Sequence, residues 1–216
     1  MRRVDISMPL FAGMPMFPGD PPFESRSVSS LAGGDPYDLS ALSFGSHAGT
    51  HIDPPSHFLR GGVTVDRLDL DVLVGPCRVV EMGPSTTTIG AKEAGDVPRG
   101  TVRVLFRTAN STRWKRELSF FPDFVGLTVA AAEVLLERGV RLVGIDALSI
   151  ENDPTETYPV HRALLGRGVV LLEGLVLADA PTGEYRLECL PLRLKDGDGG
   201  PARATLVTEE ATGRWR

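Results

Sequence analysis

The sequence predicts an α/β protein whose core is a mixed, barrel-like β-sheet with helices on the outside. β-rich runs alternate with helical patterns in the middle of the chain, further β-rich runs lie at both ends, and glycine and proline are spread between them as turn residues. The 216 residues fit a single domain, residues 1–216, which would bury about 70% of the surface of the unfolded chain.

The first half of the chain supplies several predicted strands. Residues 2–7, "RRVDIS", and residues 38–47, "DLSALSFGSH", have the β-rich or alternating pattern of strands. A short helical turn over residues 65–73 leads into a strand over residues 76–82. The clearest strand is "TVRVLFRTA", residues 101–109, because it is β-branched and bounded by the turn signals "PRG" and "NST".

The second half alternates between helices and strands. Residues 127–140, "LTVAAAEVLLERGV", predict the clearest helix, since Thr128 can cap its start and a glycine can end it. A strand over residues 141–147 follows, and then a short helix over residues 159–168 with Pro159 in its first turn. This succession is typical of an α/β protein.

Three more strands are expected near the C-terminus. The apolar run "VVLLEGLVL", residues 169–177, reads as one fully buried strand. Residues 183–194 and 202–208 read as two further strands that form a hairpin around "KDGDGGP".

Composition and charge exclude several classes of partner. A formal charge of −5 argues against a surface that gathers phosphate groups, so no nucleic-acid partner is expected. No segment approaches the ~20 apolar residues of a membrane span. Asp5, Pro9 and Pro15 interrupt the apolar start before it can form a signal-peptide core. We therefore expect a cytoplasmic protein that contacts no membrane. Cys77 and Cys189 lie in apolar runs far apart, which predicts buried free thiols.

Histidine is concentrated in one short stretch. "HAGTHIDPPSH", from His47 to His57, holds three of the four histidines of the chain. On an extended strand His47, His51, Asp53 and His57 share one face. A helix is excluded, because two consecutive prolines follow Asp53. Full extension fails as well, since it would put the first two histidines ~13 Å apart, too far for shared metal binding. The chain is therefore expected to bend at Gly49.

This pattern is compatible with a metal site. Imidazole nitrogen and carboxylate oxygen together suit zinc, manganese or iron better than calcium. Three such ligands leave coordination positions open for water, as in a catalytic site. The alternative is a surface turn, in which histidines and Asp-Pro dipeptides are common.

Glu173 is a second indication, because it interrupts an apolar run. An ionised carboxylate in a buried strand is costly unless it is paired, hydrogen-bonded or bound to a cation. The remaining histidine, His161, lies on the helix that precedes this strand, so both can reach the same end of the sheet. The alternative is an ion pair between Glu173 and an arginine such as Arg162 or Arg203.

These residues carry a resemblance to a known family. "HAGTHIDPPSHF" matches every fixed position of the HxGTHxDxPxHF signature of the cyclase family of metal-dependent hydrolases, which includes bacterial kynurenine formamidases and isatin hydrolases. "MPMFPGD", "VGIDALSIE", "HRALL", "VVLLEGLVL" and "LPLRLKDGDGGPARATLV" resemble further family segments, so the resemblance runs nearly end to end. It implies a barrel-like α/β fold and a homo-oligomer, dimer or tetramer, with active sites near subunit contacts.

The resemblance implies a role for each ligand-type residue. His47, His51 and Asp53 would hold a first metal ion, usually zinc. Asp53 would bridge to a second ion that His161 and Glu173 complete. The implied cofactor is thus zinc, with two ions per subunit, and manganese is the alternative.

The resemblance also makes His57 the general acid/base rather than a ligand. The implied substrate is a small aryl amide, above all N-formylkynurenine, which water activated by the metals would hydrolyse to kynurenine and formate in tryptophan degradation. With an ordinary pKa near ~6.5, His57 suits proton transfer to the departing aniline nitrogen. Ser149 and Asn152 are candidates for orienting polar groups of the substrate, and turn chemistry is their alternative explanation.

One position departs from the kynurenine formamidase pattern. Those enzymes typically have tryptophan just before "PGD", packed on the substrate ring, and this chain has Phe17. Phenylalanine can still form a wall for an aryl substrate. The change keeps an alternative open, namely an isatin hydrolase-like or other cyclic-amide hydrolase. A further alternative, of a different class, is a non-catalytic metal-binding protein.

Overall fold

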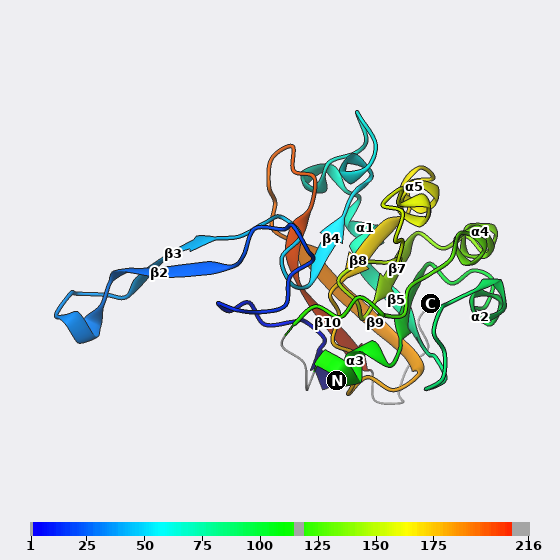
Figure 1. Ribbon diagram of the computed structural model, residues 1–216, viewed down its shortest axis with the longest axis horizontal. Coiled ribbons are helices and arrows are strands. Elements are labelled where there is room, and N and C mark those ends of the chain that lie inside the picture. Colours follow the sequence, from blue (N-terminus) through cyan, green and yellow to red (C-terminus); the bar gives the residue numbers. More distant parts are fainter. Residues whose placement is uncertain (1, 115–118, 209–216) are drawn as a thin grey trace.

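The computed structural model describes residues 2–114 and 119–208 and shows a barrel-like body from which a two-stranded hairpin projects (Figure 1). The body is built on an eight-stranded sheet with the order β1-β10-β4-β8-β7-β6-β5-β9. An additional pairing of β9 with β10 closes every strand except β1 into a ring. The strands of this sheet are β1 (Arg2–Asp5), β4 (His51–Asp53), β5 (Val74–Glu81), β6 (Arg103–Arg107), β7 (Leu142–Ile145), β8 (Val170–Glu173), β9 (Gly183–Pro191) and β10 (Gly200–Thr208).

The sheet is mixed, as predicted. Strands β5 to β8 run parallel to one another. The pairings that involve β1, β4, β9 and β10 are antiparallel. The strands predicted within residues 2–7, 76–82, 101–109 and 141–147 are all present, and β9 and β10 form the predicted C-terminal hairpin. The predicted fold class, a barrel-like mixed sheet with peripheral helices, is confirmed.

Helices α2, α4 and α5 pack over the outer face of the ring (Figure 1). Helix α4 begins as predicted, because the Thr128 hydroxyl accepts a hydrogen bond from the backbone N–H of Ala131 at 3.2 Å. Pro159 opens α5 as predicted. Helices α2 and α3 have no counterpart in the sequence prediction, because five residues are too few to show helical periodicity. The helices are α1 (Leu70–Leu73), α2 (Ala91–Gly95), α3 (Asn110–Trp114), α4 (Val129–Glu137) and α5 (Pro159–Leu165), with short 3-10 helices η1 (Leu31–Gly33), η2 (Pro55–His57) and η3 (Val65–Arg67).

Two clusters of buried side chains cover the two faces of the sheet. On β6, Val104 and Phe106 belong to the cluster under the helices, whereas Leu105 belongs to the cluster inside the barrel. This alternation follows from the pleat of the strand. Cys77 and Cys189 lie in the inner cluster as buried free thiols, which confirms the prediction for both.

The projecting hairpin consists of β2 (Glu24–Ser29) and β3 (Leu39–Ser43), which pair antiparallel as a separate sheet. The strand predicted within residues 38–47 is therefore present, but it does not join the barrel. Its side chains are exposed on both faces, including Leu39 and Leu42. The alternating pattern identified the strand, and nothing in that pattern specified its partner.

Among the described residues, we find no helix with the length and apolar character needed to cross a membrane.

Gly174 ends β8 directly after Glu173, so the predicted single strand over residues 169–177 is wrong beyond that point. Gly174 has φ +66, and a Cβ there would lie 2.1 Å from the carbonyl oxygen of Gly49. We expect Gly174→Ala to lower the free energy of unfolding by more than about 2 kcal/mol, because a left-handed backbone costs a non-glycine residue about 1–2 kcal/mol before any clash is added. Urea unfolding would measure the change.

Gly100→Ala is the matched control for this prediction. Gly100 has φ +84, but a Cβ there meets nothing within 4 Å. It should therefore lose only the conformational part, about 1 kcal/mol. Equal losses in the two variants would show that the close approach of Gly174 to Gly49 is not a constraint.

Candidate functional site

Strands β4 and β8 place three ligand-type side chains on one face of the sheet. His51 pairs with Glu173 across the ladder, and Asp53 pairs with Leu171. Ile52 points into the barrel, so His51 and Asp53 on either side of it point outward. Glu173 has the same parity as Leu171, which belongs to the cluster under the helices. The site therefore lies on the outer face of the barrel, not within it.

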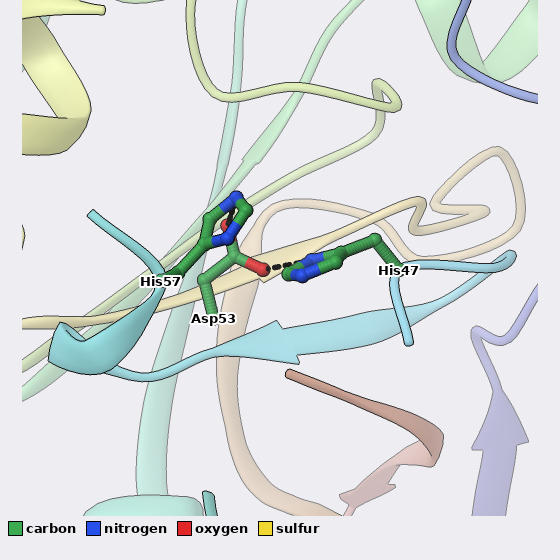
Figure 2. A group of neighbouring side chains, drawn as sticks. All are labelled: His47, Asp53 and His57. Carbon is green, nitrogen blue, oxygen red and sulfur yellow. Dashed lines mark hydrogen bonds and ion pairs between the residues drawn. The ribbon is translucent and has the colours of Figure 1, made fainter. Parts of the chain in front are cut away.

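Gly49 lets the chain turn back between His47 and β4. It has φ +64, and a Cβ there would lie 2.6 Å from Cδ2 of Leu10. The turn brings Nδ1 of His47 to 2.8 Å from Oδ1 of Asp53 (Figure 2). The predicted bend at Gly49 is confirmed, and β4 begins only at His51.

The other two histidines reach Asp53 from separate elements. His57 ends η2, and its Nε2 lies 4.0 Å from Oδ2 of Asp53. Its ring packs against that of His47, with 4.0 Å between the ring centroids (Figure 2). His161 lies in the first turn of α5, with Nε2 3.9 Å from Oδ2 of Asp53 and 3.3 Å from Oε1 of Glu173. All four histidines of the chain thus surround one aspartate.

His51 joins the two carboxylates. Its Nε2 lies 3.3 Å from Oδ1 of Asp53 and 3.4 Å from Oε2 of Glu173. Its Nδ1 contacts the carbonyl oxygen of Gly49 at 2.9 Å, which turns Nε2 toward the carboxylates. The resemblance assigns His51 and Asp53 to the first metal ion and Glu173 to the second. The structure does not separate these two groups clearly, because His51 contacts both Asp53 and Glu173.

The arginine alternative for Glu173 is wrong. Arg162 donates a hydrogen bond to the carbonyl oxygen of Thr157 at 3.1 Å. Arg203 donates to Asp5 at 2.9 Å. Glu173 is buried among histidines instead, so imidazole groups partner its charge.

The buried carboxylates control the protonation of the histidines. Burial alone would lower the pKa of His51, but Asp53 and Glu173 outweigh it and raise that pKa to about 10. Burial is likewise outweighed by Glu151 and Glu173 at His161, where the pKa rises to about 10. Hydrogen bonds from histidines hold the pKa of Asp53 well below its ordinary value despite its burial. Protons supply the positive charge that a divalent cation would otherwise bring, so metal binding would release them.

One oxygen at the centre of the cluster has no partner. Oδ2 of Asp53 is buried and accepts no hydrogen bond within residues 2–114 and 119–208. A buried acceptor without a partner is costly. Two groups of residues each bring three ligand atoms within 4.8 Å of one another. One group is His47, Asp53 and His57, and the other is His51, Asp53 and Glu173. This nitrogen and oxygen donor set fits a divalent ion such as zinc or manganese.

A cavity of about 270 Å³ adjoins the cluster. Phe17 lines it, and the ring of Phe17 packs edge-on against Phe120 with 5.4 Å between centroids. Phe17, Phe58 and Leu148 give the cavity apolar walls, and the histidines and Glu173 of the cluster converge on it. Apolar walls beside convergent polar groups are typical of a small-molecule site. The lining residues are Phe17, Asp20, His47, His51, His57, Phe58, Leu148, Ser149, Tyr158, His161 and Glu173. A larger cavity, of about 590 Å³, lies at parts of β5, β6 and β9, away from these residues.

Ser149 and Asn152, the two candidates for orienting the substrate, differ in their position relative to the cavity. Ser149 lines the cavity, although its hydroxyl donates to the carbonyl oxygen of Glu151 at 3.0 Å. Asn152 is not among the lining residues, and its amide donates to the carbonyl oxygen of Pro122 at 2.6 Å. Asn152 therefore ties its loop to the distant segment around Pro122, whereas the hydrogen bond within the turn is the one made by Ser149.

Sequence reasoning missed several residues around the cluster. Asp20, Phe58 and Tyr158 line the cavity, and Glu151 contacts His161. Phe58 and Asp20 lie inside sequence segments that were already singled out, which was a usable signal. Glu151 ends the singled-out segment "VGIDALSIE" and had the same signal. Tyr158 had none, because its position depends on how the loop before α5 folds back onto the sheet.

Comparisons with known proteins agree with this architecture. The Cyclase family model matches residues 4–152. The kynurenine formamidase of Paracidovorax citrulli (strain AAC00-1) is 38% identical over 213 residues, which cover 94% of this chain and 95% of the relative. A protein described as a predicted metal-dependent hydrolase, from Bacillus stearothermophilus, has a TM-score of 0.81 at 33% identity, covering 95% of this chain and 97% of that one. Isatin hydrolase A from Labrenzia aggregata has a TM-score of 0.78 at 27% identity, covering 96% and 94%.

Proposed function

Because the chain belongs to the Cyclase family, we propose that it is a metal-dependent amide hydrolase, and specifically an arylformamidase that converts N-formylkynurenine to kynurenine and formate. The observation that carries the proposal is the cluster of four histidines around the buried, unpartnered oxygen of Asp53, beside an aromatic-walled cavity. Kynurenine formamidases among the relatives support the substrate.

We propose two divalent ions per subunit, zinc or else manganese. His47, His51 and Asp53 would hold the first ion, and His161 and Glu173 the second, with Asp53 shared. The contacts of Asp53 with all four histidines support its bridging position. An ion bound there would lower the pKa of water toward ~7 and polarise a carbonyl oxygen.

His57 is the proposed proton carrier. It is the histidine of the cluster with the most exposed side chain, 27%, and it lines the cavity. In the proposed reaction it accepts a proton from the attacking water and passes it to the aniline nitrogen as the C–N bond breaks. Its place beside the ligands supports an enzyme over a non-catalytic metal-binding protein.

Phe17 is the proposed aromatic wall for the substrate ring. We expect Phe17→Ala to lower kcat/KM for N-formylkynurenine about 10- to 100-fold, mainly through KM, because removing a buried aromatic contact loses roughly 1.5–3 kcal/mol. Phe11→Ala is the control, since Phe11 belongs to the same N-terminal segment but is exposed and outside the cavity lining. Equal losses in both variants would contradict the role of Phe17.

An isatin hydrolase-like enzyme is the second candidate. Phenylalanine at position 17 and the structural similarity to isatin hydrolase A favour it. Such an enzyme would open a cyclic amide with the same ligands and the same proton carrier. The two candidates differ in the shape of the substrate.

A substrate panel tests the proposal. Purified protein would be assayed with N-formylkynurenine, other N-formyl anilines, isatin and aliphatic formamides, before and after treatment with a chelator. We expect hydrolysis of N-formylkynurenine that the chelator abolishes and added zinc restores. Opening of isatin without hydrolysis of N-formylkynurenine would favour the second candidate. Full activity in metal-free protein would contradict both.

We further propose that the enzyme is a homodimer or homotetramer. The projecting β2–β3 hairpin supports this, because Val28, Leu39 and Leu42 are about half exposed along it, and an isolated two-stranded hairpin is only marginally stable in water. Light scattering on the purified protein would test the oligomeric state, and a monomer would contradict the proposal.

A further inference from the structure

Glu151 is a buried carboxylate that holds His161 from the side away from the cluster. Its side chain is 3% exposed. Its Oε1 accepts hydrogen bonds from Nδ1 of His161 at 2.6 Å and from the backbone N–H of His161 at 2.9 Å. Its Oε2 accepts from the backbone N–H of Val160 at 2.9 Å. One carboxylate therefore caps the start of α5 and accepts a hydrogen bond from the imidazole ring of His161.

The contact with Nδ1 decides which nitrogen of His161 faces the cluster. An ionised carboxylate can only accept, so Nδ1 must carry a proton. Nε2 then points to Oε1 of Glu173 at 3.3 Å and Oδ2 of Asp53 at 3.9 Å. We propose that Glu151 is a positioning residue, which fixes the tautomer and orientation of His161 so that the ring binds metal through Nε2. This inference rests on the proposed function of the cluster as a metal site.

The backbone around Glu151 is hydrogen-bonded to Glu173, which together with His161 is proposed to bind the second ion. The N–H of Ile150 donates to Oε1 of Glu173 at 2.6 Å. The carbonyl oxygen of Ile150 accepts from the N–H of Leu127 at 2.8 Å, and Ser149 donates to the carbonyl oxygen of Glu151 at 3.0 Å. This one segment therefore orients both His161 and Glu173, the proposed ligands of the second ion.

The group that contacts Nδ1 of His51 differs chemically from the group that contacts Nδ1 of His161. Nδ1 of His51 contacts the neutral carbonyl oxygen of Gly49, whereas Nδ1 of His161 contacts a carboxylate. A carboxylate partner makes the opposite ring nitrogen a stronger ligand and is typical of histidines that bind metals. Loss of the charge at Glu151 should therefore weaken one ion selectively, the one that His161 binds.

Zinc titration of Glu151→Gln tests the proposal. Glutamine retains a carbonyl oxygen that can cap α5, but it lacks the charge and can donate to Nδ1 instead of accepting from it. In competition with a chromophoric chelator, we expect about 10- to 100-fold weaker binding of one zinc ion, with the other ion bound as in the unmodified protein. The thermal midpoint of the metal-free variant should stay close to that of the unmodified protein.

Thr128→Ala is the control for a purely structural effect. It removes the side-chain cap of α4, which lies outside the cluster. The thermal midpoint should fall while both zinc affinities stay unchanged. Unchanged zinc affinities in Glu151→Gln as well would reduce Glu151 to a helix cap and overturn the proposal. Absence of zinc binding in the unmodified protein would instead overturn the metal site itself, and this assignment with it.

A second measurement needs no variant. With only four histidines, the imidazole ¹⁵N signals of the zinc-loaded protein can be assigned. We expect His161 to carry its proton on Nδ1 and to bind zinc through Nε2. Zinc on Nδ1 with a protonated Nε2 would overturn the proposal even if every Glu151 variant failed to fold.

Discussion

Asp53→Asn is expected to remove most of the bound metal and to lower kcat/KM for the amide substrate by at least about 10³-fold, because bound ions contribute several kcal/mol of transition-state stabilisation. Asp53 is the residue on which the cluster converges. Its Oδ1 lies 2.8 Å from Nδ1 of His47 and 3.3 Å from Nε2 of His51. Its Oδ2 faces His57 and His161 at 4.0 and 3.9 Å.

The physical reason is the charge of Asp53 rather than its shape. Asparagine has nearly the same volume, so packing on β4 should be kept. An amide offers one neutral oxygen in place of two anionic ones, and it cannot bridge two cations. Metal analysis of the purified variant, together with initial rates at saturating and limiting substrate, would measure both effects.

Asp198→Asn is the matched control for Asp53→Asn. Oδ2 of Asp198 also contacts His47, at 3.4 Å from Nε2, but its side chain is 61% exposed. This contact is longer than the 2.6 Å contact of Glu151 with His161, and water screens it because Asp198 is exposed whereas Glu151 is buried. The same chemical change at this position should therefore leave metal content and turnover close to those of the unmodified protein. Full metal content and turnover in Asp53→Asn would contradict the central position of Asp53.

The sequence allowed the near half of this site to be placed because that half is local. Strand parity aligns His51 with Asp53, and only a bend at Gly49 lets His47 join them. Both features are confirmed. Strand parity follows from the pleat, and the bend follows from glycine, so neither needs knowledge of the rest of the fold.

The far half depended on tertiary structure. Glu173 was marked by its cost in an apolar run, and that cost is met by His51 and His161, not by an arginine. The partner could not be chosen from sequence, because it depends on β4 lying beside β8 in the sheet. Glu151 was missed for the same reason. Its role appears only when α5 returns to the segment that follows β7.

The same distinction applies to the fold. The cap at Thr128 and the hairpin of β9 and β10 are local features, and both are confirmed. Strand β3 was identified by its alternation but pairs with β2 outside the barrel. Gly174 could not be identified as the end of β8, because the constraint is the carbonyl oxygen of Gly49 on a neighbouring segment.

His57→Ala is expected to keep its metal and to lose about 10²- to 10⁴-fold in kcat, the usual contribution of a positioned acid or base. This separates a proton carrier from a ligand. The distinction matters because His57 lies within ligand distance of His47 and Asp53 and has the geometry for either role. A fall in metal content parallel to the fall in turnover would make His57 a ligand.

The pH dependence of the unmodified enzyme gives an independent check on His57. Burial lowers the pKa of His57 below its ordinary value of 6.5, the opposite of the shift at His51 and His161. The ring is therefore neutral at pH 7 and can accept a proton. As the pH falls through this lowered pKa, the ring becomes protonated and kcat/KM should decline, with the acidic limb centred below 6.5.

Ser56→Ala is the control for His57→Ala. Ser56 lies on the same 3-10 helix and donates to the carbonyl oxygen of Gly197 at 3.3 Å, outside the cluster. It should keep metal, turnover and the acidic limb, because the proposed proton transfer needs only the imidazole of His57 beside Asp53. Loss of turnover in Ser56→Ala to the level of His57→Ala would show that disturbing η2 is enough to abolish turnover, so that the loss in His57→Ala could not be ascribed to its imidazole.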